Sequence, residues 1–200
     1  NERSVPEKTI AHLIKELPTF PEHLQLMYLI LFCTGIRKSE VCTIKSGAFY
    51  SQGNENWMRI YQSKMRREKV IPVPSLLVGL VNDYEKKYGI KNGEYLFKNK
   101  NGGAFCGQTF SNQMIRECKA HGIACGDYIF RAHDYRHNLA TSMYGNGVSI
   151  QGVRDYLGHS SENMTKQYID FMPERIVSAE DKYFSKNQSF KLKGAEDDER

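Results

Sequence analysis

Apolar residues near the start of this 200-residue chain recur with the spacing of an α-helix. The first such stretch follows Pro6 and has apolar side chains at Ile10, Leu13, Ile14 and Leu17, which predicts an amphipathic helix. A second helix is expected to begin at Pro21-Glu22, because a proline and an acidic residue suit a first helical turn. Its continuous apolar run predicts a helix that is buried on most sides and ends at Gly35.

The pattern changes between Ser46 and Val73, where turn residues separate short strand-like runs. Residues 58–62 and 69–73 predict two strands, and the charged segment from Ser63 to Glu68 predicts the hairpin that joins them. Helices are expected over residues 37–43, 74–88, 108–121, 134–144, 150–157, 162–169 and 173–183, with a polar loop at 98–103. The predicted fold class is therefore α+β, mainly α-helical, with one small antiparallel sheet.

Composition and charge narrow the function only a little. Hydrophobic residues make up 40% of the chain and charged residues 26%, which are ordinary values for a soluble globular protein. The net charge is +5, and residues 191–200 hold three basic and four acidic side chains, so residues 1–190 sum to +6. A modest basic excess fits an anionic partner such as DNA, although many proteins without such a partner are equally basic.

The cysteines and the longest apolar run favour a cytoplasmic protein. The five cysteines form an odd set without a Cys-x-x-Cys pair, which argues against a disulfide framework and a structural zinc site. The run from Leu26 to Cys33 is too short to span a bilayer, and there is no signal peptide, so no membrane partner is expected. Because the chain starts at Asn1 without a methionine, we expect a fragment or a processed product.

Two arginines have the sequence surroundings of phosphate ligands. Arg37 follows Gly35, which is expected to end one helix and to set the arginine at the start of the next, and Arg136 lies in a later predicted helix. A guanidinium presents a planar fork of donors that fits two phosphate oxygens, and it stays charged at any working pH. Each arginine alone would more often be a surface residue or an ion-pair partner. Glu40, one turn after Arg37, is expected to hold that side chain or to cap neighbouring amides.

Two histidines and a tyrosine complete a set that suits phosphoryl transfer to a hydroxyl group. His133 lies three residues before Arg136, so both can face one side of a helix. His159 lies in a turn marked by Gly158, and Tyr168 follows nine positions later. A phenol has a reference pKa of about 10, and nearby arginines would favour the nucleophilic phenolate. The competing candidates by proximity are His137, Tyr135, Tyr144 and Tyr156.

The charged hairpin offers a candidate general acid. Lys64 is expected at its tip, where an ammonium can reach a phosphate and donate a proton to the departing oxygen. Lys69 is the alternative if the register differs, and a basic hairpin is more often only a solvated turn. Fixed cations can stabilise the charge that develops at phosphorus, so this chemistry requires neither a metal nor another cofactor. The candidates for contacts with a DNA backbone are Lys38, Arg66 and Arg67.

This ordered set of residues resembles the catalytic domain of the tyrosine recombinases, the phage-integrase family. Their shared pattern is an arginine in a Thr-Gly-x-Arg-x-x-Glu segment, a lysine in a β-hairpin, His-x-x-Arg, Gly-His and then the tyrosine. The likeness extends from about Pro6 to Tyr183, and it has one departure at Tyr135, where a leucine is more usual. The resemblance implies catalytic roles for Arg37, Lys64, His133, Arg136, His159 and Tyr168.

The resemblance further implies a site-specific recombinase, an integrase or transposase of a phage or mobile element. Such enzymes cleave and rejoin double-stranded DNA through a 3′-phosphotyrosyl intermediate without metal or ATP, typically as a tetramer on two DNA sites. Residues 1–185 would form the catalytic domain, with a helix at about 173–184 that docks on a neighbouring subunit. Residues 186–200 are expected to form a polar, mobile tail, and the family's N-terminal core-binding domain is expected to lie outside this sequence. The alternatives are a type IB topoisomerase and a non-catalytic DNA-binding regulator on the same fold.

Overall fold

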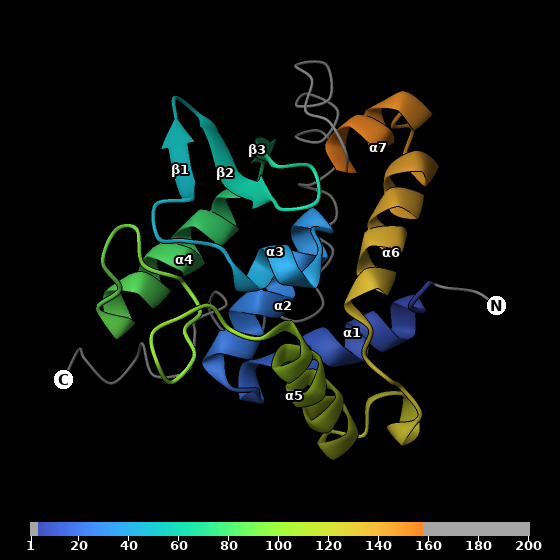
Figure 1. Ribbon diagram of the computed structural model, residues 1–200. Helices are drawn as coiled ribbons and strands as arrows, with labels where there is room; N and C mark the ends of the chain where they lie inside the picture. The colour runs from blue at the N-terminus through green and yellow to red at the C-terminus, as the bar shows by residue number, and fades with distance from the viewer. Residues whose placement is uncertain (1–3, 158–200) are drawn as a thin grey trace.

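Helix α2 (Glu22–Thr34) runs through the centre of the computed structural model, which describes residues 4–157 (Figure 1). Every residue from Leu24 to Thr34 is buried. The helix has this position because its apolar residues follow one another without a polar stripe, so every face must be covered by protein. The prediction of a helix buried on most sides is confirmed.

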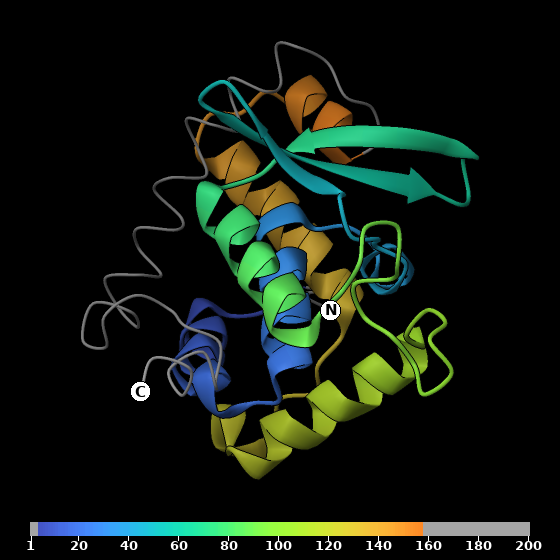
Figure 2. The ribbon, with the colours of Figure 1, turned by 90° about the vertical axis from the view of Figure 1, so that its left-hand side faces the viewer.

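Helices α3 (Lys38–Cys42), α4 (Ser75–Tyr88), α5 (Gly107–Ala120) and α6 (Ala132–Gly145) pack against α2. Helix α6 packs along it, and α4 and α5 cover other parts of its surface (Figures 1 and 2). No helix within residues 4–157 combines the length and the apolar character needed to cross a membrane. The helices expected at 162–169 and 173–183, and the tail over 186–200, lie outside the described residues. The bounds of the remaining helices are α1 (Glu7–Glu16) and α7 (Ile150–Leu157).

In the part of the chain that the structure describes, three strands form an antiparallel meander in the order β1 (Phe49–Gln52), β2 (Glu55–Gln62) and β3 (Arg67–Pro72). Met58 of β2 lies opposite Phe49 on one side and Ile71 on the other, and all three side chains are buried. One face of the sheet therefore packs on the protein, as the alternation of side chains along a strand requires. Figure 2 shows this sheet next to α7, and the hydroxyl of Tyr156 in α7 donates to the carbonyl of Pro72 at the end of β3.

The hairpin between β2 and β3 is shorter than the sequence predicts. Pairing of Gln62 with Arg67 and of Tyr61 with Glu68 extends the ladder to the edge of the turn, so only residues 63–66 connect the strands. The expected hairpin, Ser63 to Glu68, was therefore too long, because charged residues can continue a strand when their backbone is paired. The register also places Lys69 opposite Ile60, on the buried face of the sheet.

Gly35 ends α2 and brings the chain into close contact with α6. It has the left-handed backbone conformation, with φ of 60°, and its N–H donates to the carbonyl of Leu31 at 2.9 Å. A Cβ at this position would lie 2.9 Å from Cδ2 of Leu139 and 3.3 Å from Cα of Arg136. The glycine is thus required twice, for its backbone conformation and for the space between α2 and α6.

These two requirements can be separated with a matched pair of substitutions. Gly89 ends α4 with φ of 59° and has open space where a Cβ would lie. We expect Gly89→Ala to lower the free energy of unfolding by about 1 kcal/mol, the usual cost of a left-handed alanine. Gly35→Ala should lose a further 1–3 kcal/mol, roughly, through overpacking against α6. Urea unfolding of both variants measures this difference, and equal losses would contradict the close contact.

Candidate active site

Arg37 is held at the start of α3 by Glu40. The arginine is the residue that precedes the helix, and its N–H donates to Oε1 of Glu40 at 3.0 Å. The same carboxylate oxygen lies 3.6 Å from Nη1 of Arg37. Glu40 is only 5% exposed, whereas the arginine side chain is partly open to solvent. The expectation that Glu40 orients Arg37 and caps an amide agrees with this geometry.

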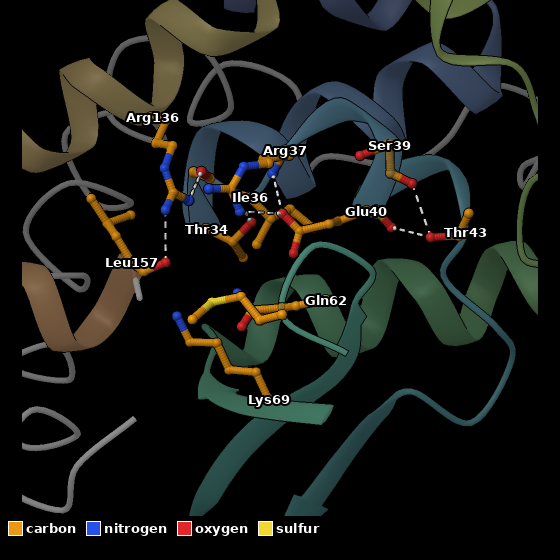
Figure 3. A network of polar contacts seen from close by, with 12 residues as sticks. Thr34, Ile36, Arg37, Ser39, Glu40, Thr43, Gln62, Lys69, Arg136 and Leu157 are labelled. Carbon is orange, nitrogen blue, oxygen red and sulfur yellow. Dashed lines mark hydrogen bonds and ion pairs between the residues drawn. The ribbon is translucent and has the colours of Figure 1, made fainter. Parts of the chain in front are cut away.

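Arg136 joins three separate parts of the chain. Its Nη1 donates to the carbonyl of Gly35 at 3.2 Å, and its Nη2 donates to the carbonyl of Leu157 at 2.7 Å. The guanidinium, which α6 supplies, therefore contacts the end of α2 and the end of α7. Burial lowers the pKa of Arg136, and the positive charge of Arg37 lowers it further. Figure 3 shows the side chains of Arg37 and Arg136 pointing toward each other.

A third cation, Lys69 of β3, extends toward the two arginines (Figure 3). Its side chain is only 4% exposed, and its Nζ donates to the carbonyl of Tyr156 in α7. Burial lowers the pKa of Lys69 to about 7, and the charges of Arg136, Arg67 and Arg37 act in the same direction. Glu40 partly opposes this shift. The site thus contains a lysine that sits at the border between its charged and neutral forms at neutral pH.

Within residues 4–157, the charges around this cluster are unbalanced in favour of cations. Lys69, Arg37 and Arg136 influence one another, and the acidic group that acts on them is Glu40. Like charges in a partly buried site repel one another strongly, because the low polarisability of protein screens them poorly. An anion with several oxygens would relieve this repulsion and accept from two guanidinium groups. The arrangement therefore suits a phosphate group.

The structure brings some of the predicted residues together and leaves others apart. His133 lies in the first turn of α6 and is exposed, and the prediction that it faces the same side as Arg136 stays a prediction. Lys64 is exposed in the turn after β2, whereas Lys69 is buried. His159 and Tyr168 lie outside the described residues.

The three candidate DNA contacts differ in their surroundings. Lys38 donates to Oγ of Ser111 at 3.4 Å, which ties α3 to α5. Arg66 is exposed in the hairpin turn and has a positive φ of 51°. Arg67 is half-buried, and its Nε donates to Oε1 of Gln62 at 3.3 Å. Arg66 is thus the member of this set with the most open access to a macromolecular partner, and Arg67 is partly used within the sheet.

Two of the rival tyrosines are built into the core. Tyr135 is fully buried, and its hydroxyl is hydrogen-bonded to the hydroxyls of Tyr28 at 3.1 Å and Tyr128 at 2.9 Å. Burial raises its pKa well above the ordinary value. Tyr156 is also buried, and its hydroxyl donates to the carbonyl of Pro72 at 3.4 Å. Neither hydroxyl is available as a nucleophile, whereas Tyr144 is 60% exposed.

Sequence comparison decides the family of this chain. Residues 3–175 match the model of the phage integrase family. The chain belongs to that family. Its relatives include transposase B from transposon Tn554 of Staphylococcus aureus, 30% identical over 190 residues, and the tyrosine recombinase XerA of Pyrococcus furiosus, 26% identical over 180 residues. These matches cover 92% and 88% of this chain, but only 30% and 60% of the relatives, so the chain spans less than two thirds of their length.

Solved structures of the family share the fold. The XerH site-specific recombinase bound to its difH substrate has a TM-score of 0.64 at 20% identity, over 88% of this chain and 52% of that chain. The catalytic core of lambda integrase has a TM-score of 0.59 at 20% identity, over 80% of this chain and 96% of that chain. The predicted fold, a mainly helical tyrosine-recombinase domain with a small antiparallel sheet, is confirmed.

Lys69 was considered from the sequence only as a substitute for Lys64, and its burial was missed. The signal is present in the alternation of β3, because Lys69, Ile71 and Val73 occupy every second position. All three side chains are buried. A lysine in an inward position is rare enough in a soluble protein to indicate a special environment.

The buried lysine predicts how stability depends on pH. Below about pH 7 the ammonium is charged in both the folded and the unfolded chain, so the cost of burying it is fully present. Above pH 7 the folded chain releases this proton, whereas the unfolded chain holds it until its ordinary pKa near 10.5. The free energy of unfolding of the wild type, relative to Lys69→Met, should therefore rise by on the order of 2 kcal/mol between pH 6 and pH 9.

Urea unfolding of the two proteins across this pH range measures that difference. Subtracting the variant removes the contributions of the other titratable groups, which the two proteins share. A difference that stays constant from pH 6 to pH 9 would show that Lys69 keeps its ordinary pKa in the folded chain.

Proposed function

We propose that this chain carries the catalytic machinery of a site-specific DNA recombinase, an integrase or transposase of a mobile element. The observation that carries the proposal is the convergence of Arg37 and Arg136, from segments about a hundred residues apart, in a chain of the phage integrase family. Paired guanidinium groups with little acidic compensation suit a phosphodiester better than a neutral substrate. The Tn554 transposase among the relatives supports the association with mobile elements.

The proposed reaction is a transesterification at a DNA phosphate. The phenolate oxygen of Tyr168 attacks phosphorus and forms a 3′-phosphotyrosyl bond, while the bond from phosphorus to the 5′ oxygen breaks. Arg37 and Arg136 bind the non-bridging oxygens and stabilise the added negative charge, with His133 and His159 as further donors to the phosphate or acceptors of the phenol proton. A 5′-hydroxyl then attacks the same phosphorus and releases the tyrosine, so bond energy is conserved without metal or ATP.

The departing 5′ oxygen requires a proton, and Lys64 remains our candidate donor. It lies in the exposed turn between β2 and β3, where it can approach a duplex that rests against the protein. Lys69, the alternative, is tied to a backbone carbonyl and largely excluded from solvent. An exposed hairpin turn is better suited than a buried strand position to follow a phosphate as DNA binds.

The proposed partners are double-stranded DNA and further copies of this chain. Solved relatives include XerH bound to its difH substrate and a lambda integrase tetramer bound to a Holliday junction. We propose by analogy that residues 1–185 form one catalytic domain, that residues 173–184 dock on a neighbouring subunit, and that four subunits assemble on two DNA sites. Lys38, Arg66 and Arg67 are proposed contacts with the DNA backbone, and binding should weaken steeply as salt increases.

The nucleophile can be tested with a nicked duplex that traps the covalent intermediate. The wild-type chain should give a protein–DNA adduct that survives SDS, and Tyr168→Phe should give none, because the phenyl ring has no oxygen to attack phosphorus. Tyr144→Phe is the matched control, since it removes an exposed hydroxyl and should leave the yield unchanged. An adduct that persists in Tyr168→Phe would assign the nucleophile elsewhere. If no candidate duplex gives an adduct with the wild type, a non-catalytic DNA-binding role is favoured.

The role of the arginine pair is tested by changing geometry while keeping charge. Arg136→Lys retains a cation but loses the planar fork of donors, so the rate of adduct formation should fall by about 10²- to 10³-fold. Arg131→Lys changes an exposed arginine just before α6 and serves as the control. Single-turnover kinetics at saturating DNA measure both rates. A wild-type rate in Arg136→Lys would refute bidentate binding of the phosphate.

A further inference from the structure

The carboxyl end of α7 is held by two cations that come from different elements. Lys69 of β3 donates to the carbonyl of Tyr156, and Arg136 of α6 donates to the carbonyl of Leu157 at 2.7 Å. These are consecutive residues, and Leu157 is the last described residue of the helix. Partial negative charge gathers toward the carboxyl end of a helix, so two positively charged donors are well suited to bind carbonyls there.

The hydrogen bond from Lys69 to the carbonyl of Tyr156 does not require a charged donor. Arg136, Arg37 and Arg67 act on its ammonium unfavourably, and Glu40 is the acid that acts in its favour. The ring of Tyr156 contributes a cation–π contact, with Nζ 5.8 Å from the ring centroid. A neutral donor could bind the carbonyl without the cost of desolvating a charge beside arginines. A residue that opposes stability within a site is expected to serve the function of that site.

The position of α7 matters because of the residues that follow it. Leu157 is directly followed by Gly158 and His159, and Tyr168 lies eleven residues after Leu157. A shift of the last described turn of α7 would therefore shift the start of the segment that contains these proposed catalytic residues. Without Lys69, Arg136 would still bind the carbonyl of Leu157, but the carbonyl of Tyr156 would lose its cationic donor.

We propose that Lys69 is a positioning residue, which together with Arg136 clamps the end of α7 and so sets where the segment with His159 and Tyr168 begins relative to the arginine pair. This inference rests on the function proposed above and deepens it. Lys69 acts here through the α7 backbone, not as a proton donor and not as a ligand of the phosphate. The three roles give different results in one set of measurements.

The test compares Lys69→Met with the wild type, using Lys15→Met as the control, all in the full 200-residue chain. Methionine is unbranched and one atom shorter than lysine, and it removes the buried charge, so the fold should be retained. Lys15 is an exposed lysine in the last turn of α1. Three quantities are measured: the Kd for a nicked duplex, the single-turnover rate of adduct formation at saturating DNA, and hydrogen exchange of the amides in α7.

Substrate chemistry separates positioning from proton donation. A duplex with sulfur in place of the bridging 5′ oxygen has a leaving group that departs as a thiolate and needs no acid. We expect Lys69→Met to form the adduct about 10- to 100-fold more slowly with the oxygen substrate, to remain slow with the sulfur substrate, and to bind the duplex with an unchanged Kd. Exchange in α7 should become faster. Lys69→Arg, which keeps charge and donor, should retain more of the rate than Lys69→Met.

Several outcomes would overturn the inference. A wild-type rate in Lys69→Met would exclude any positioning role, and restoration of the rate by sulfur would make Lys69 the proton donor. A weaker Kd with an unchanged rate at saturation would make it a ligand of the DNA, and Lys69→Arg no faster than Lys69→Met would exclude the clamp. If the wild type forms no adduct at all, the proposed function fails instead. Exchange in α7 then still decides whether Lys69 holds this helix, because unchanged exchange refutes the clamp.

Discussion

The contact between Gly35 and α6 is the constraint on which the rest of the site depends. The chain leaves the central helix there in a left-handed conformation, and only hydrogen fits between this residue and the α6 positions of Arg136 and Leu139. Arg136 also donates to the Gly35 carbonyl, so the two segments are fixed by packing and by a hydrogen bond. Arg37 follows Gly35 by two residues, and Glu40 holds it in place. The contact between Gly35 and α6 therefore also brings the guanidinium of Arg37 near that of Arg136.

This arrangement concentrates positive charge where the protein offers little negative charge in return. Burial and the neighbouring arginines lower the pKa of Lys69. Arg136 donates to the carbonyls of Gly35 and Leu157, which belong to separate elements. The large buried core around α2 stabilises a fold that can tolerate such repulsion. In the proposed function, a phosphate group bound by these cations would turn this repulsion into favourable interaction. Fixed cations that repel one another in the free protein can stabilise the negative charge that develops at phosphorus.

The described cations divide into a fixed set and an accessible set. Arg37, Arg136 and Lys69 are tied to main-chain or carboxylate oxygens, whereas the side chains of Lys64 and His133 are exposed to solvent. Fixed groups can hold a phosphate in one geometry, whereas exposed side chains can change conformation as DNA binds. The register of β3 creates this division, because it turns Lys69 inward while the hairpin turn carries Lys64 outward.

Within residues 4–157, the sequence by itself determined the helices and the presence of a small antiparallel sheet, and its motifs indicated the family. Periodic apolar positions, capping residues and ordered motifs are local properties. Gly35 illustrates this, since its place after an apolar run predicted both the end of α2 and the start of the segment with Arg37. Only the tertiary structure decided that Lys69 lies beside the arginines, that Tyr135 is part of a buried hydroxyl network and that Arg136 binds the end of α7. These features depend on how the sheet and the helices pack together. Such packing arises from contacts between residues far apart in the chain, such as Lys69 with Tyr156 and Arg136 with Gly35, which no local pattern encodes.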